Sequence, residues 1–397
     1  MSSNLPPLAK AKYQEYLDAG SKEEKIKKLE EFLSLVPKHK ATEKIVALNK
    51  SRLAKMKREV EEHRLKQKST QKVISPFSIK KEGIQIILVS TYQTPGVGKT
   101  SLLNLLTGAA EEKIGKYTSL PEIGIYQYQK IRFQIVEMPS IMAGASEGVA
   151  NGKEILAQLR AADLICFCID LSRNFEEQIE LLLNELSKAD IRINVLPPPL
   201  TIEKTGANKI QVLYLSIEAK NVEELDEFTL EIKDIIHENG IRNAIVKIYG
   251  EITLDNVIDA LTPSVVYKKV IILGTKGDLA YTQDIFENLT SKYSNKFPII
   301  IGTSFIKKSF PEDFGFIILK FLNKIRIYTM SNNIVAEQPL IMDGDPTIKD
   351  VALKVHRSFY DSFDHAIVIR EGERQKRKKV GLDYKLQDND IVEIHTT

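Results

Sequence analysis

One short stretch of this sequence carries residue types that suit it to binding phosphate. Residues 93–100 read Gln-Thr-Pro-Gly-Val-Gly-Lys-Thr, follow the apolar run Ile84–Val89 and precede a leucine-rich helical pattern. Backbone N–H groups at the start of such a helix point towards bound phosphate, Lys99 can neutralise phosphate oxygens, and the Thr100 hydroxyl can ligate magnesium. The pattern predicts a nucleotide-binding loop made by Pro95, Gly96, Val97, Gly98, Lys99, Thr100 and Ser101.

A carboxylate and several hydroxyls further along the chain could hold the magnesium ion. Glu137 ends the apolar run Ile131–Val136, where GTP-hydrolysing proteins with this kind of loop carry Asp-x-x-Gly. Glu137 keeps a carboxylate, whereas Ser140 replaces the glycine whose backbone N–H would meet the γ-phosphate. Hydroxyls at the usual distance for a first switch come from residues 117–119, and which of them acts stays open. The predicted metal ligands are Thr100, Thr118, Ser119 and Glu137.

A second motif points to recognition of guanine. Residues 275–278, Thr-Lys-Gly-Asp, close the apolar run Lys269–Leu273 and stand where guanine-specific proteins carry Asn-Lys-x-Asp. A carboxylate at Asp278 accepts hydrogen bonds from the guanine N1–H and amino group, a pattern that adenine does not offer, and this weighs against an ATPase. The stem of Lys276 can lie over the base. The predicted guanine contacts are Thr275, Lys276, Asp278, Thr303 and Ser304.

Hydrolysis of the nucleotide is expected to be slow. Ile141 stands where a water-positioning glutamine would follow the Glu137–Ser140 turn, so we assign no catalytic residue. Gly144, Gly148 and Gly152 give the following segment the backbone freedom of a mobile switch or of an ordinary flexible loop.

The motifs need a sheet that brings them together, and the apolar runs predict one. Near-continuous apolar strands separated by helical stretches indicate a doubly wound α/β sheet covered on both faces, which binds ligands at the carboxyl ends of its strands. Cys166 and Cys168 lie two apart on one run, so they point to the same face and predict buried strand cysteines, not a disulfide. The predicted strands are Ile84–Val89, Ile131–Val136, Leu164–Ile169, Lys269–Leu273 and Pro298–Ile301.

Three further parts surround this sheet. About 100 residues between the third and fourth strands predict an inserted α+β subdomain, with strands at Ile191–Val195, Ile210–Leu215 and Ala244–Tyr249 and a helix at Val222–His237. The last 70 residues predict a small β-grasp fold, with a helix at Thr347–Tyr360. The predicted domains are a helical N-terminal domain at 1–75, a nucleotide-binding domain at 76–188 and 262–326, the insertion at 189–261 and the β-grasp domain at 327–397.

The charges of the 397-residue chain are nearly balanced, with a net charge of +3, but they are unevenly placed. Residues 38–68 hold eleven Lys and Arg against four Glu, and Arg370–Lys379 holds six basic residues. These stretches are either arms for an anionic partner such as RNA or solvated surfaces, and charge alone does not decide. Ser21 followed by Glu24 predicts a helix start within a basic helical hairpin at residues 1–72.

The apolar runs are too short to cross a membrane. The longest, Leu164–Ile169, has six residues, whereas a spanning helix needs 18 or more, and the N-terminus lacks a signal-like apolar region. We therefore expect no membrane partner and a cytoplasmic location. The sequence leaves the oligomeric state open.

Several separate stretches resemble the developmentally regulated GTP-binding protein (DRG) branch of the Obg GTPases. The resemblance implies a P-loop GTPase fold with a C-terminal TGS domain from about Ile327, bound GTP or GDP, magnesium, and association with translation through the ribosome, ribosomal RNA or a small stabilising protein. The family's lack of a catalytic glutamine agrees with Ile141. The stretches are residues 37–44, 53–62, 94–108, 160–172, 191–199 and 237–246.

Two functions follow from these patterns. The first is a magnesium-dependent GTP-binding protein with slow hydrolysis, acting as a molecular switch on a ribosome-linked or RNA-containing partner. The alternative is a non-hydrolysing scaffold that uses its basic arms to bind RNA or protein. Departures from the motifs at Gln93, Glu137, Ser140 and Thr275 favour the alternative, and the order of the motifs favours the first.

Overall fold

The computed structural model divides the chain into two compact units, residues 1–75 and 76–397. It describes residues 6–37, 42, 46, 49, 52, 53, 56, 75–206, 209–215, 222–371 and 377–397. In the first unit, helices α1 (Pro7–Asp18) and α2 (Lys22–Leu35) share a small apolar core around Phe32. The Ser21 side chain accepts a hydrogen bond from the Glu24 N–H, which confirms the predicted helix start. Most of the basic run at 38–68 lies outside the described residues.

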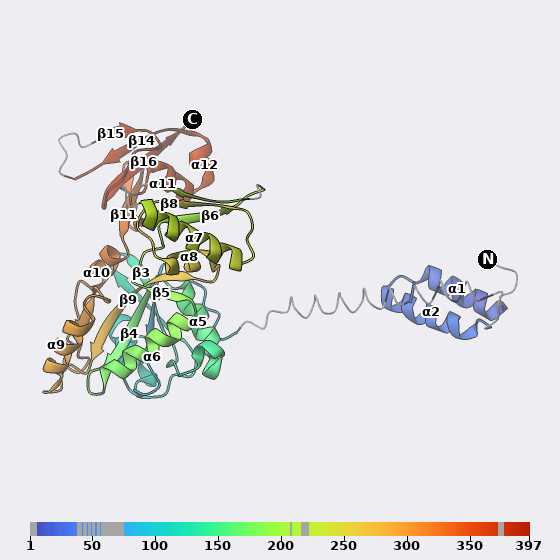
Figure 1. Ribbon diagram of the computed structural model, residues 1–397, viewed down its shortest axis with the longest axis horizontal. Coiled ribbons are helices and arrows are strands. Elements are labelled where there is room, and N and C mark those ends of the chain that lie inside the picture. Colours follow the sequence, from blue (N-terminus) through green and yellow to red (C-terminus); the bar gives the residue numbers. More distant parts are fainter. Residues whose placement is uncertain are drawn as a thin grey trace. The chain divides into compact units, whose positions relative to one another are not determined.

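The second unit contains a seven-stranded sheet (Figure 1). Six strands follow the order β10-β9-β4-β1-β3-β2, and β5 pairs with β9. Every pairing is parallel except β2 with β3, which is the arrangement expected when helices connect the strands. The strands are β1 (Ile84–Val89), β2 (Glu122–Tyr128), β3 (Ile131–Glu137), β4 (Leu164–Asp170), β5 (Ile191–Ile193), β9 (Val266–Thr275) and β10 (Ile300–Gly302).

Helices cover both faces of this sheet, as the apolar runs predict. Every residue of β1 and β4 is buried, and alternate side chains enter two different cores. One core packs against α5, α6 and α9, and the other against α4 and α10. Cys166 and Cys168 are free, buried and on the same face. The helices are α4 (Lys99–Thr107), α5 (Gly152–Ala161), α6 (Phe175–Lys188), α9 (Thr282–Tyr293) and α10 (Phe314–Phe321).

The inserted region has its own sheet and core. Strands β6 (Leu200–Lys204), β7 (Ile210–Tyr214) and β8 (Ala244–Ile248) pair in the order β6-β8-β7 and pack against α7 (Val222–Glu238) and α8 (Leu254–Leu261). One expectation was wrong. The strand predicted at Ile191–Val195 for the insertion is β5, which pairs with β9 of the large sheet because its isoleucines pack into that sheet's core.

The C-terminal part forms a mixed six-stranded sheet in the order β12-β11-β16-β14-β15, with β13 also on β11. The helix predicted at Thr347–Tyr360 is two helices, because the backbone at His356 is extended and its ring accepts a hydrogen bond from the Ser358 N–H to start the second. The elements are β11 (Lys324–Ser331), β12 (Ile334–Val335), β13 (Leu340–Asp343), α11 (Ile348–Val355), α12 (Arg357–Asp361), β14 (Phe363–Ile369), β15 (Lys378–Val380) and β16 (Asp390–Thr396).

No helix in the described part of the chain is both long and apolar enough to span a membrane.

The glycine-bearing segment that follows β3 is folded into short, anchored turns. Gly144 and Gly148 have φ angles of 82° and 111°, which favour glycine, and a Cβ on Gly152 would collide with the backbone of Ala145. The carboxylate of Glu185 on α6 accepts hydrogen bonds from the Gly144 N–H (2.9 Å), the Ser146 N–H (2.8 Å) and the Ser146 hydroxyl (2.8 Å). The buried Glu185 side chain therefore ties this segment to the large core.

The anchor at Glu185 predicts a local, pH-dependent effect. Burial raises the pKa of Glu185, but the hydrogen bonds from Ser146 and Gly144 together lower it by more than burial raises it. The pKa of Glu185 therefore lies below its ordinary value of 4.5. Because the folded-state pKa is depressed, the stabilisation is complete above the unfolded-state pKa and is lost as pH falls through the folded-state pKa. We expect Glu185→Gln to speed hydrogen exchange of the Gly144 and Ser146 amides by about 10- to 100-fold at pH 7.

At acidic pH, hydrogen exchange corrected for intrinsic rates should give the same protection of the Gly144 and Ser146 amides in wild type and Glu185→Gln, because wild-type Glu185 becomes protonated. Glu180→Gln, an exposed position on the same helix, serves as the control and should leave both amides unchanged. Equal protection in wild type and Glu185→Gln at pH 7 would contradict the anchoring role.

Candidate nucleotide-binding site

Residues 90–98 link β1 to α4, and the residues predicted to bind phosphate, Pro95 to Ser101, lie at the end of this loop and in the first turn of the helix. Gly96 and Gly98 have φ angles of 72° and 102°, and a Cβ on Gly98 would lie 2.8 Å from the Phe305 ring. Glycine is therefore required at both turns for backbone reasons, and at Gly98 also for space. The helix begins at Lys99, so its free N–H groups lie at the loop as predicted.

The loop is longer at its start than the motif spacing suggests. The motif places Gln93 at the first glycine position, but β1 ends at Val89 and Ser90 follows the strand directly. The added residues continue the parallel pairing with the segment after β3, because the Ile141 N–H donates to the Ser90 carbonyl (2.8 Å) and the Tyr92 N–H donates to the Ile141 carbonyl (3.1 Å). Gln93 thus lies within a loop that has additional residues and does not directly follow the strand, which explains why no glycine is needed there.

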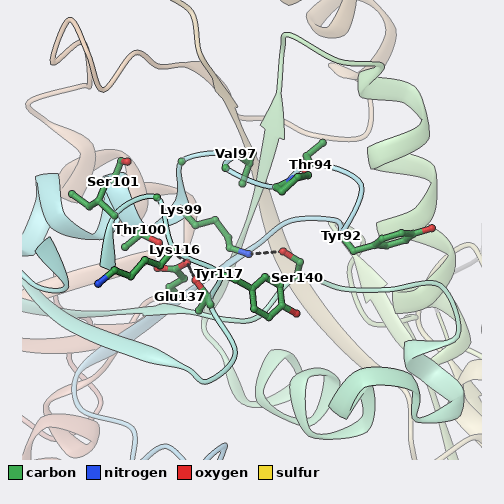
Figure 2. Close-up of a pocket in the computed structure, with 16 residues that line it drawn as sticks. Tyr92, Thr94, Val97, Lys99, Thr100, Ser101, Lys116, Tyr117, Glu137 and Ser140 are labelled. Atoms are coloured by element: carbon green, nitrogen blue, oxygen red, sulfur yellow. Dashed lines mark hydrogen bonds between the residues drawn. The ribbon is translucent and has the colours of Figure 1, made fainter. Parts of the chain in front are cut away.

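A cavity of about 390 Å³ opens beside this loop, and Lys99 points into it (Figure 2). Lys99 is only 5% exposed, and its Nζ atom donates to the hydroxyls of Ser90 (2.9 Å) and Ser140 (3.1 Å). Burial lowers the pKa of Lys99, and the nearby carboxylate of Glu137 opposes this shift. No carboxylate lies within 4 Å of the ammonium among the residues that the structure describes, so the ammonium is suited to receive an anionic ligand.

The carboxylate of Glu137 also lines the cavity and accepts hydrogen bonds from two hydroxyls. Its Oε1 atom accepts hydrogen bonds from Thr100 (2.9 Å) and Thr118 (2.6 Å), whereas buried Oε2 has no hydrogen-bond partner in the described part of the chain. A carboxylate, two hydroxyls and an unpaired buried oxygen fit a hard divalent cation such as Mg²⁺. Ser119 is exposed and does not line the cavity, so the structure brings Thr118 and not Ser119 to this group.

The two predicted base-contacting loops are adjacent. The Ser304 hydroxyl donates to Asp278 Oδ1 (2.9 Å), and the Gly277 N–H donates to the Thr303 carbonyl (3.0 Å). The Thr275 and Thr303 hydroxyls are buried and donate to the backbone carbonyls of Ile169 and Gly274, both at 3.1 Å. These two threonines therefore shape the loops, and Asp278 is oriented by Ser304.

The sequence reasoning missed Asp170, which lies at the end of β4 and is fully buried. Its Oδ2 atom lies 2.6 Å from Lys276 Nζ, and its Oδ1 atom accepts from both the N–H and the hydroxyl of Ser172. The neighbouring Arg173 donates to the Gln93 carbonyl (2.7 Å), so the loops predicted to bind the base and the phosphates are linked through residues 170–173. The position of an aspartate at the carboxyl end of a predicted strand was the available signal.

Ser90 and several residues that line the cavity were also outside the prediction. Ser90 directly follows β1, and its position at the end of a strand was the available signal. The cavity is also lined by Tyr92, Ile114, Gly115, Lys116 and Tyr117, and of these only Tyr117 was singled out from the sequence.

Comparisons with known proteins agree with this geometry. A family model described as 50S ribosome-binding GTPase matches residues 92–197, a model of the C-terminal region of that domain matches residues 213–305, and a TGS domain model matches residues 325–396. These matches confirm the expected P-loop GTPase domain and C-terminal TGS domain.

Three curated relatives align along nearly the whole chain. An uncharacterised GTP-binding protein of Methanocaldococcus jannaschii is 31% identical over 386 residues, covering 94% of this chain and 92% of the relative. The developmentally-regulated GTP-binding protein 2 homolog of Dictyostelium discoideum is 28% identical, and Ribosome-interacting GTPase 1 of Saccharomyces cerevisiae is 26% identical; each alignment covers 94% of this chain and 98% of the relative. The chain belongs to the family of developmentally regulated GTP-binding proteins.

Proposed function

We propose that this protein binds GTP and GDP with Mg²⁺, hydrolyses GTP slowly and acts as a switch on a ribosome or another structured RNA. The observation that carries this proposal is that a buried ammonium, Lys99, and a nearby buried carboxylate, Glu137, line one cavity at the start of α4. Neither side chain has an oppositely charged partner within 4 Å in the described residues. A bound nucleotide would supply phosphate for Lys99, and its magnesium ion would supply a positive charge for Glu137.

The phosphates would lie against the loop. The backbone of residues 95–98 and the first N–H groups of α4 at Lys99, Thr100 and Ser101 would bind the phosphate oxygens, and Lys99 would exchange its two serine hydroxyls for them. Thr100, Thr118 and Glu137 would hold the magnesium ion. When bound, magnesium neutralises charge on the β- and γ-phosphates.

Guanine would bind at the neighbouring loops. Asp278, oriented by Ser304, would accept hydrogen bonds from the base, and the Lys276 stem, held by Asp170, would lie beside it. Thr275 and Thr303 would contribute by shaping the loops, because their hydroxyls already donate to backbone carbonyls.

Slow hydrolysis is supported by the environment of Ile141. This residue stands where a water-positioning glutamine would be expected, is fully buried, and is held by backbone hydrogen bonds to Ser90 and Tyr92. An apolar side chain turned into the core has no atom that orients water, so a partner would have to complete the site.

An RNA-containing partner is supported by likeness and by charge. One relative carries the name Ribosome-interacting GTPase 1, and the flanking parts of this chain hold the basic stretches at 38–68 and 370–379. By the family resemblance, a small protein that stabilises the chain is a further partner. If nucleotide binding failed and salt-sensitive RNA binding persisted, the scaffold alternative would replace the switch.

Lys99→Ala is the direct test of the phosphate site. Because Lys99 faces the cavity and bonds only two hydroxyls, we expect the fold to persist by circular dichroism while affinity for GDP falls about 30- to 1000-fold. Lys153→Ala, an exposed lysine on α5, should bind like wild type. Single-turnover phosphate release from GTP should be slow in wild type and absent in Lys99→Ala. Undiminished GDP affinity in the Lys99 variant would contradict the assignment.

Thr118 and Ser119 form a matched pair for the metal site. Thr118 is hydrogen-bonded to Glu137, whereas its neighbour Ser119 is exposed. We expect Thr118→Ala to raise the magnesium concentration needed for half-maximal binding of a GTP analogue by about 10-fold, and Ser119→Ala to leave it within twofold. Magnesium titration monitored by a fluorescent analogue measures both. A larger effect at Ser119 than at Thr118 would show that the metal ligands are misassigned.

A further inference from the structure

Ser140 stands where the motif Asp-x-x-Gly has glycine, and its side chain lines the cavity. The hydroxyl lies 3.1 Å from Lys99 Nζ and 3.2 Å from Ser90 Oγ, and it lines the cavity, as Figure 2 shows. We propose that Ser140 contacts the γ-phosphate through its hydroxyl and so lets the site favour a nucleoside triphosphate over a diphosphate. This inference rests on the nucleotide binding proposed above.

Hydrogen bonds within the protein fix the backbone on both sides of Ser140. The Met138 N–H donates to the Leu88 carbonyl (3.1 Å), and Ile141 exchanges backbone hydrogen bonds with Ser90 and Tyr92. Met138 and Ile141 are also fully buried. A glycine that reaches the γ-phosphate with its own N–H depends on backbone movement, whereas a side-chain hydroxyl on this fixed backbone needs only a rotation about χ1.

The two serines around Lys99 differ in their access to the cavity. Ser90 is fully buried behind the ammonium and does not line the cavity, whereas Ser140 is partly exposed and lines it. Ser90 is therefore placed to orient Lys99 in any nucleotide state. Ser140 is placed to meet a γ-phosphate oxygen that Lys99 also binds.

The chemistry of the hydroxyl fits this role. A serine hydroxyl has one proton to donate, and in the described structure Ser140 accepts the hydrogen bond from Lys99. A phosphate oxygen that binds Lys99 would take that bond and accept the Ser140 proton. Hydrogen bonds of this kind to a charged oxygen are stronger than those between neutral groups. A diphosphate lacks the γ-phosphate and its oxygens, so removal of the hydroxyl should affect the triphosphate selectively.

The test compares Ser140→Ala and Ser90→Ala in the full chain, by titration with GDP and with a non-hydrolysable GTP analogue at saturating magnesium. We expect Ser140→Ala to lower affinity for the analogue about 10- to 100-fold and to leave GDP affinity within twofold. Ser90→Ala should lower both affinities by the same factor. Ser140→Thr, which keeps the hydroxyl, should restore the preference for the analogue.

Three outcomes would overturn the inference. Equal losses for GDP and the analogue in Ser140→Ala would mean that Ser140 acts only through Lys99, as Ser90 does. Unchanged affinity for both would mean that the hydroxyl has no role in binding. A wild-type chain that binds no guanine nucleotide would overturn the proposed function and this inference with it, whereas wild-type GDP binding together with either of the first two results would overturn the inference alone.

Discussion

The candidate site keeps one ammonium, Lys99, and one carboxylate, Glu137, buried near each other, with hydroxyls as their polar partners. Lys99 and Glu137 are each 5% exposed or less, and charged groups pay a large desolvation cost unless their surroundings compensate for it. The hydrogen bonds from Thr100 and Thr118 and those to Ser90 and Ser140 supply part of that compensation. Because the desolvation cost of these two charges is only partly compensated within the protein, the binding of a charged ligand explains them better than a contribution to stability does.

The sheet topology is what makes such a site possible. Parallel strands β1, β3, β4 and β9 present their carboxyl ends at one edge, so residues far apart in sequence meet there. Three links then connect the loops: the pairing of Ile141 with residues 90–92, the contact of Arg173 with Gln93, and the contact of Ser304 with Asp278. Glu185 anchors the turns that follow β3. This edge of the sheet is therefore more rigid than the glycines at 144, 148 and 152 alone would suggest.

The sequence predicted the parts of this arrangement that have a strong local signal. Continuous apolar runs located β1, β3 and β4, and the Gly-Lys-Thr motif located the loop, because burial and phosphate binding each impose a residue pattern. Strand β2 and the roles of Ser90 and Asp170 escaped prediction, since they depend on which residues become neighbours across the sheet. The pairing of β5 with β9 was missed for the same reason. Gln93 departs from the motif because the loop between β1 and α4 is longer than the motif, and the sequence pattern did not show that length.

Every proposal made for this protein rests on the cavity beside Lys99 binding guanine nucleotide and magnesium. Calorimetric titration of the purified wild-type chain with GDP, a non-hydrolysable GTP analogue and ATP, each with and without magnesium, is the decisive experiment. We expect binding of both guanine nucleotides, tighter with magnesium, and little or no binding of ATP. Failure to bind any of the three, or equal affinity for ATP and the guanine nucleotides, would contradict these proposals.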